Sequence, residues 1–162
     1  MYFVSKLFTT SKICIYLMLL VFGSSVTYAK NPTFQDYPAS AYTGKNQPLK
    51  LTAQSRKYRT LFKQMSQQTP NFAGHYVMET VGCGGGCSFV ITYNAKTGQS
   101  FVLPDTFADC YSEQKGFKQN DIFYQKDSRL VMAIGSRSGD QAQCETVYYL
   151  VENNHFKEIS RQ

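Results

Sequence analysis

A helical period of hydrophobic residues begins shortly after residue 50. Hydrophobic side chains recur there at i, i+3, i+4 and i+7, at Tyr58, Leu61, Phe62 and Met65. This spacing places them on one face of an amphipathic helix. Thr52 can cap the start of that helix, and Pro70 prevents its continuation. The pattern therefore predicts a single helix between these two residues.

After Gly74 the pattern changes to short runs rich in β-branched and aromatic residues, separated by turn residues. We expect strands at residues 75–81, 88–93, 101–103, 122–124, 130–135, 146–151 and 155–159. Such a run predicts a mainly β fold, an antiparallel meander of about seven strands in a sandwich or open barrel. The N-terminal helix would cover one face of the sheet. The 12 Tyr and 12 Phe residues supply the core, since Trp is absent.

The N-terminus has the three parts of a secretory signal peptide. Lys6 and Lys12 precede an apolar run at residues 13–22, and small and polar residues follow. The run is too short for a membrane-spanning helix, which needs about 20 residues. We expect cleavage after Ala29, with Ser25 as the alternative, and a periplasmic or secreted protein without a membrane span. The predicted domains are a signal at 1–29, an extended leader at 30–50 and one β-rich domain at 51–162.

The cysteine count supports export. Cys14 lies in the apolar run and leaves with the signal, so four of the five cysteines remain. An even number in an exported chain predicts a disulfide framework. We favour two bridges, Cys83–Cys87 and Cys110–Cys144, although crossed pairings stay open. In the chain-entropy model the short ring contributes about 2 kcal/mol and the long ring about 4 kcal/mol.

Positive charge is concentrated in the front third of the mature chain. Residues 30–75 contain seven Lys or Arg against one Asp, whereas residues 76–162 contain eight Lys or Arg against ten Asp or Glu. Arg56, Arg59 and Lys63 share the polar face of the predicted helix. A solvated face is the simple interpretation. The alternative is a patch for an acidic partner such as an anionic lipid surface, a wall polymer or an acidic protein. We expect no nucleic-acid partner.

The segment at residues 82–87 places three glycines between two cysteines. A three-residue spacing differs from that of a thioredoxin-type redox pair, and a zinc site would need further ligands, which His75 and His155 are too far apart to supply. No Lys followed by Ser or Thr closes the loop as in a phosphate loop. We expect no metal and no cofactor. The predicted binding residues of this loop are Gly82, Gly84, Gly85 and Gly86, whose backbone amides can form an anion-binding nest.

Catalytic chemistry has few candidates. No Gly-x-Ser-x-Gly elbow is present, and the polar loop with Ser136, Ser138 and Asp140 resembles turn chemistry. Glu79 and Asp109 are the candidate carboxylates for hydrolysis of a glycan. Asp105 and Asp109 are explained more simply as turn and cap residues.

The segment Asn-Phe-Ala-Gly-His-Tyr at residues 71–76, followed by Gly82, Cys83, Gly84 and Cys87, resembles an uncharacterised family of small exported proteobacterial proteins. The resemblance runs to about Leu103. It implies export and a shared fold, and it carries no activity and no catalytic residue. Periplasmic lysozyme inhibitors are similar in class alone, as small disulfide-bearing β proteins whose signature motifs are not found here.

These observations predict a periplasmic binding protein that uses the loop at residues 82–87 as its contact surface, because function concentrates on loops held by a rigid scaffold. A specific version is an inhibitor or immunity protein against a cell-wall hydrolase. The partner would then be a periplasmic protein or a wall component. One alternative is a wall-active hydrolase that uses Glu79 or Asp109. The other is a structural envelope protein held on anionic surfaces by its basic helix.

Overall fold

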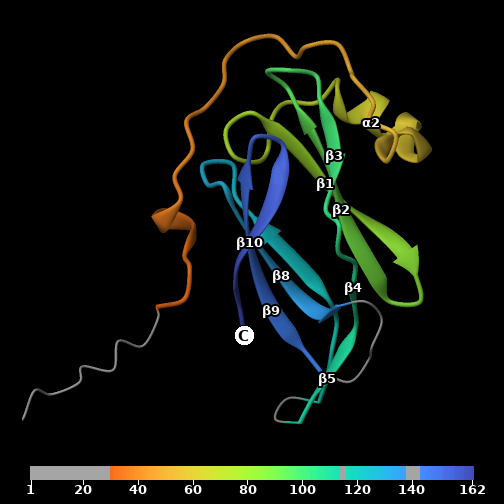
Figure 1. Cartoon of the computed structure of the whole chain (residues 1–162), viewed down its shortest axis with the longest axis vertical. Coiled ribbons are helices and arrows are strands. Elements are labelled where there is room, and N and C mark those ends of the chain that lie inside the picture. Colours follow the sequence, from red (N-terminus) through yellow and green to blue (C-terminus); the bar gives the residue numbers. More distant parts are fainter. Residues whose placement is uncertain (1–29, 114–115, 138–142) are drawn as a thin grey trace, which may run out of the picture. The chain divides into compact units, whose positions relative to one another are not determined.

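One antiparallel sheet dominates the computed structural model, which describes residues 30–113, 116–137 and 143–162. Eight strands follow the order β1-β2-β4-β8-β9-β10, with β3 beside β2 and β7 beside β8 (Figure 1). The strands of this sheet are β1 (Tyr76–Gly84), β2 (Cys87–Asn94), β3 (Ser100–Val102), β4 (Phe107–Ala108), β7 (Asp121–Tyr124), β8 (Leu130–Arg137), β9 (Glu145–Glu152) and β10 (His155–Arg161). Two more strands, β5 (Cys110–Ser112) and β6 (Gly116–Lys118), pair only with each other among the described residues.

The short strand β4 joins the two halves of the sheet. Phe107 pairs with Ser88 of β2 on one side and with Arg137 of β8 on the other. Gly135 permits this close approach, because a side chain at that position would lie 2.7 Å from the carbonyl oxygen of Ala108. The fold therefore depends on a two-residue strand that no hydrophobic period reveals.

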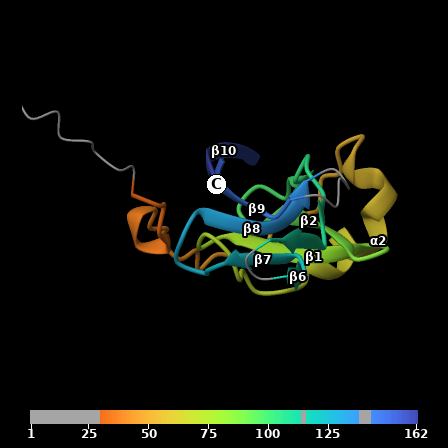
Figure 2. The ribbon, with the colours of Figure 1, turned by 90° about the horizontal axis from the view of Figure 1, so that it is seen from below.

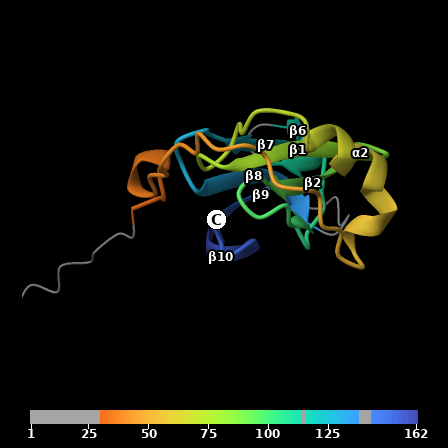
Figure 3. The ribbon, with the colours of Figure 1, turned by 90° about the horizontal axis from the view of Figure 1, so that it is seen from above.

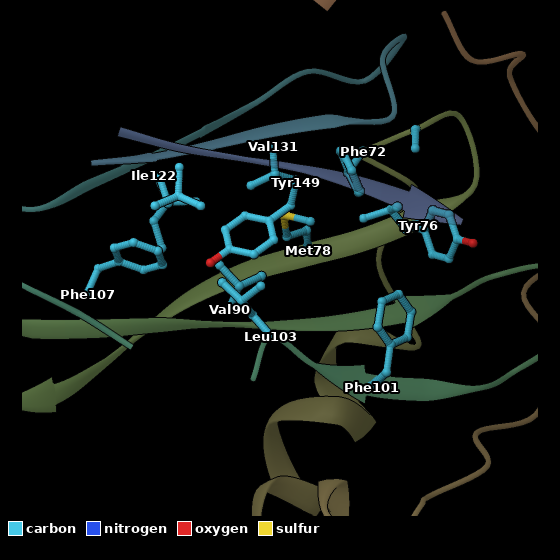
Figure 4. Packing of buried hydrophobic residues seen from close by; sticks show 14 residues of the cluster. Phe72, Tyr76, Met78, Val90, Phe101, Leu103, Phe107, Ile122, Val131 and Tyr149 are labelled. Atoms are coloured by element: carbon cyan, nitrogen blue, oxygen red, sulfur yellow. The ribbon is translucent and has the colours of Figure 1, made fainter. Parts of the chain in front are cut away.

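The larger hydrophobic cluster takes residues from both halves of the sheet, and Figure 4 shows it from close by. Figures 2 and 3 show the ribbon of the two halves from below and from above. Met78 of β1 and Val90 of β2 contribute from one half, while Val131 of β8 and Tyr149 of β9 contribute from the other. All four are buried. At about 25 cal/mol per Å² of apolar surface removed from water, this burial is the main force that folds the sheet over on itself.

A second cluster lies on the opposite face of β1 and β2, under the helix. The predicted helix is present, as a 3-10 turn η2 (Ser55–Tyr58) followed by α2 (Arg59–Met65), and it ends five residues before Pro70. Phe62 and Met65 are fully buried against this face. Thr52 starts the turn by accepting a hydrogen bond from the amide of Ser55 at 3.2 Å. Strand β2 is consequently buried on both faces.

The segment before the helix forms a strap over the turns of the sheet. It contains one short 3-10 turn, η1 (Phe34–Asp36), and is otherwise extended as predicted. Its backbone hydrogen bonds reach three turns of the domain: Ala39 donates to Asp127, Tyr42 to Gly74 and Gln47 to Ala95. The strap and the β strands form one compact unit, Asn31–Gln162.

Two residues of the segment at positions 71–76 have structural roles. The side chain of Asn71 bonds to both the amide and the carbonyl of Met78, at 2.8 and 3.0 Å, and so covers the free edge of β1. Gly74 has φ +72°, and a side chain there would collide with the backbone of Ser40 in the strap. The roles of Asn71 and Gly74 in the fold therefore account for the presence of these two residue types in the segment.

The fold prediction is confirmed: all seven expected strands are present, the sheet is antiparallel, and a helix covers one face. The favoured pairing, Cys83–Cys87 and Cys110–Cys144, is also confirmed. Strands β4, β5 and β6 were not predicted. The signal peptide and cleavage site that the sequence predicts lie outside the described residues. None of the helices in the described part of the chain has the length and apolar character needed to cross a membrane.

Candidate functional site

The hairpin of β1 and β2 ends in a tight glycine turn closed by a disulfide (Figure 1). Gly84, Gly85 and Gly86 have φ values of +90°, +59° and +73°. Positive φ at both central positions, Gly85 and Gly86, fits a type I′ hairpin turn, which glycine adopts without strain. A side chain built on Gly84 or Gly85 would meet nothing within 4 Å. The tip therefore presents bare backbone to its surroundings.

The base of the tip is fixed by a polar network. The carbonyl oxygen of Gly86 accepts one hydrogen bond from the amide of Asp109 and another from the side chain of Asn120, both at 2.8 Å. The Asp109 carboxylate accepts from the backbone and side-chain nitrogens of Asn120, at 2.9 and 2.8 Å. Ser88 donates to the Asn120 side-chain oxygen. Gly86 cannot be replaced freely, because a side chain there would collide with the Asp109 carboxylate.

Two exposed aromatic side chains lie beside the tip. Tyr111 of β5 and Phe117 of β6 are direct cross-strand partners, and their exposed fractions are 57% and 66%. Together with Gly85, Gly86 and Asp109 they line a surface cavity of about 440 Å³. We call these five residues the tip surface. The expectation that aromatic residues supply the core holds for residues such as Phe72 and Tyr93, which are fully buried, and is wrong for Tyr111, Phe117 and Phe123, which are exposed.

The second disulfide lies directly under the tip surface. Cys110 is 2% exposed and joins β5 to Cys144, which precedes β9. Cys110 also lines the cavity beside Tyr111. A disulfide therefore anchors strand β5, which carries Tyr111, and another disulfide closes the glycine turn.

The two predicted catalytic carboxylates have separate partners. Asp109 is occupied with Asn120 and the tip, whereas Glu79 of β1 accepts a hydrogen bond from Gln68 at 2.7 Å. Glu79 precedes Gly84 by five positions along β1, about 16 Å at the usual rise of a strand. The described residues therefore do not present these carboxylates as one acid–base pair.

The basic residues of the helix remain free of the sheet. Arg56, Arg59 and Lys63 are exposed, and within the described residues no carboxylate lies within 4.0 Å of them. Arg56 lies in the 3-10 turn η2, and Arg59 and Lys63 lie in α2, where a spacing of four positions puts side chains on the same face. We call these three residues the basic stripe.

Arg137 of β8 is the centre of a charged cluster. Its guanidinium bonds to Glu158 at 2.8 Å and lies 3.6 Å from Glu145 and 3.9 Å from Asp105. The hydrogen bond to Glu158 raises the pKa of Arg137 and lowers the pKa of Glu158. Burial and the hydrogen bond to Asp105, at 2.6 Å, raise the pKa of the Tyr149 hydroxyl. Each charged side chain in the cluster has a partner of opposite charge, as is typical of ion pairs that stabilise a fold.

Comparison with protein-family models, with curated proteins and with solved structures finds no match to this chain. The functional interpretation therefore depends on the geometry of the surfaces described above.

The polar loop with the serine candidates does not form a described catalytic site. Ser136 is 2% exposed and pairs with Ala108 in the sheet. Ser138 and Asp140 lie outside the described residues. Within the described ranges, no group of three or more His, Cys, Asp or Glu side chains is arranged to hold a metal ion.

Among the predicted binding residues, the structure gathers Gly85 and Gly86 at the tip surface and places the basic stripe on a different element. Sequence reasoning missed Tyr111, Phe117 and Asn120. A local signal existed for the aromatic pair, because neither Tyr111 nor Phe117 belongs to a hydrophobic run in the sequence. No local signal marks Asn120, whose role depends on a partner 34 positions away.

Proposed function

We propose that this protein is exported to the periplasm and binds another protein through the tip surface, and that the partner is a cell-wall hydrolase, which it inhibits. The observation that carries the proposal is the exposed aromatic pair, Tyr111 and Phe117, beside a rigid hairpin tip. Large aromatic side chains are enriched among the residues that supply most binding energy in protein interfaces.

The exposure of this pair is unusual within the described chain. Tyr111, Phe117 and Phe123 are its only exposed large hydrophobic side chains, and the first two are adjacent. Leaving both rings in water forgoes the stabilisation of about 1.5 to 3 kcal/mol that burial of a large side chain provides. A partner that covers them would recover that free energy in the complex.

Preorganisation of the tip supports the same proposal. The disulfide, the two hydrogen bonds to Gly86 and the Asp109–Asn120 pair restrict the turn before any partner binds. Immobilising a flexible loop or side chain on binding costs about 0.5 to 1.5 kcal/mol for each rotamer-rich side chain. A glycine turn with no side chains avoids this cost and can enter a narrow cleft. The active-site cleft of a hydrolase is a surface of that shape.

The two disulfides support an oxidising compartment, because such bonds form and persist outside the reducing cytoplasm. The periplasm is the compartment that the signal-peptide pattern favours. Mass spectrometry of the exported protein tests this step directly. We expect a mature N-terminus at Lys30, and an intact N-terminus on the exported chain would contradict it.

The experiment for inhibition uses a panel of muramidases and amidases, assayed on peptidoglycan with and without the purified protein. We expect saturable inhibition of at least one enzyme, with a loss of tenfold or more in affinity when Tyr111→Ser and Phe117→Ser are combined. Phe123→Ser is the matched control, because Phe123 is exposed at 39% on β7 and lies outside the tip surface. If no enzyme is inhibited and none is captured, the proposal fails.

A second candidate function, attachment to an anionic surface, is favoured by the basic stripe. Arg129, Arg137 and Arg161 are each paired with a carboxylate, whereas Arg56 and Arg59 have no such partner within the described ranges. Unpaired exposed cations attract anionic surfaces over about 8 Å at physiological ionic strength.

Vesicles that contain phosphatidylglycerol test this candidate. We expect binding that weakens as salt rises and that falls in the double variant Arg56→Gln and Arg59→Gln. The control double variant, Lys126→Gln and Lys157→Gln, removes the same charge from two exposed positions on other elements. Equal loss in both variants would mean that only net charge matters, and the candidate would be rejected.

A further inference from the structure

A cavity of about 480 Å³ lies between the start of η2, strand β3 and the turn that joins β9 to β10. Its lining includes Phe101 and Phe156, whose ring centroids are 5.3 Å apart. The volume is within the usual range of small-molecule sites, about 300 to 1,000 Å³, and an apolar wall with a few polar groups is also typical of them. None of the tip-surface residues lines this cavity.

The polar rim of this cavity has unused hydrogen-bonding capacity. Gln54, Asn153 and His155 line the cavity. Within the described part of the chain, none of these three side chains has a hydrogen-bond partner. Each amide offers both donors and acceptors, and a neutral imidazole offers one of each. These groups are therefore available to a bound molecule.

The walls that carry this rim are rigid. On one side, the hydroxyls of Ser55 and Ser100 are 2.7 Å apart, and Ser100 also donates to the carbonyl of Lys50 at 2.8 Å. On the other side, Asn154 accepts from Asn94 at 2.6 Å and donates to the side chain of Gln99. These bonds fix the walls of the cavity, so the walls need little rearrangement when a ligand binds.

The charge of the lining restricts the chemistry of the ligand. None of the lining residues is Asp, Glu, Lys or Arg. An ionised ligand would lose hydration without gaining an opposite charge, which is costly in a partly buried site. A neighbouring cavity of about 550 Å³ shares Asn153 and Asn154 but is lined by Lys96, Arg129 and Glu152. Charged side chains therefore line the neighbouring cavity, whereas the cavity with Phe101 and Phe156 has none.

We propose that the cavity lined by Phe101 and Phe156 binds an uncharged saccharide. A sugar ring presents an apolar C–H face, which suits an aromatic wall, and hydroxyl groups along its edge, which suit amides that both donate and accept. Gln54 and Asn153 contact the hydroxyl groups, and His155 contacts a third polar group of the same unit. This site is independent of the tip surface and does not rest on the proposed inhibition.

Titration calorimetry and saturation-transfer NMR on the purified protein test this proposal with three neutral probes, chitotetraose, cellotetraose and maltotetraose. We expect saturable binding of at least one of them. Asn153→Gly and Gln54→Ala should each weaken that binding about tenfold, which corresponds to about 1.4 kcal/mol. Glycine is chosen at position 153 because the φ of +50° there is one that glycine adopts readily.

Gln67→Ala is the matched control, because it removes an exposed amide that does not line the cavity. We expect it to bind the probe as the unchanged protein does. Absence of saturable binding for all three probes overturns the proposal, as does binding that survives both Asn153→Gly and Gln54→Ala. The tip variants Tyr111→Ser and Phe117→Ser should retain saccharide binding, so failure of the inhibition proposal is distinguishable from failure of this one.

Discussion

The hairpin tip and the interior between the two halves of the sheet are held in place by different forces. At the tip, a side chain added at Gly84 or Gly85 would meet no atom within 4 Å. The turn keeps its shape through a disulfide and hydrogen bonds. In the interior, Phe107 and Tyr149 are at most 1% exposed and pack edge to face with centroids 6.3 Å apart. Stability therefore belongs mainly to the interior, and the tip is free to serve recognition.

The sharpest way to break this comparison is to remove Phe107, the buried side chain of the strand that joins both halves of the sheet. We expect Phe107→Ala to lower the free energy of unfolding by about 3 to 5 kcal/mol, since it leaves a cavity in a packed core. Urea denaturation followed by circular dichroism measures the change. Phe123→Ala, at a position 39% exposed, should cost less than about 1 kcal/mol, and equal losses would show that the interior is not the stabilising region.

The Cys110–Cys144 disulfide tests how far the interior supports the tip surface. It closes a loop of 34 positions and lies under Tyr111. We expect the double variant Cys110→Ala and Cys144→Ala to lose about 4 kcal/mol of stability, because the unfolded chain regains the entropy that the bridge removed. Thermal unfolding of the oxidised protein and of the variant gives the difference. A loss below that of the tip disulfide would contradict the assignment of this bridge to the structural interior.

The Cys83–Cys87 disulfide should matter less to stability and more to recognition. Its ring spans four positions, for which the chain-entropy model gives about 2 kcal/mol. We expect Cys83→Ala combined with Cys87→Ala to leave the protein folded, while amide exchange at Gly85 and Gly86 becomes faster. Hydrogen-exchange mass spectrometry measures this local opening. Exchange that accelerates equally in β8 and β9 would show that the tip and the interior unfold as one unit.

The interior was predictable from sequence to a far greater extent than the tip surface. Met78, Val90 and Tyr149 belong to runs whose length and β-branched or aromatic content indicate strands wherever they pack. Strand β4 has two residues, too few for any period, so its place between β2 and β8 follows only from the folded sheet. The glycines between Cys83 and Cys87, which tolerate the backbone angles of a short ring, were enough to favour the pairing that the structure has.

The exposure of Tyr111 and Phe117 could not be predicted in the same way. Aromatic residues are buried in most folds, and only the position of the isolated β5–β6 pair leaves these two in water. The contact between Asn120 and Gly86 is likewise a product of tertiary structure. Glycine and cysteine content drew attention to the loop at residues 82–87, whereas the side chains that surround this loop came from a later part of the chain.

The smallest expected change in stability separates recognition from folding most cleanly. Tyr111→Ser combined with Phe117→Ser removes two rings that are 57% and 66% exposed, so we expect the free energy of unfolding to change by less than about 0.5 kcal/mol for each substitution. The same variant should lose tenfold or more in affinity for an inhibited hydrolase. Parallel urea titrations and inhibition assays measure both quantities on one preparation. A large loss of stability would show that the two rings stabilise the fold. Unchanged inhibition would show that they do not contact the hydrolase, because rings that supply binding energy cannot be removed without a loss of affinity.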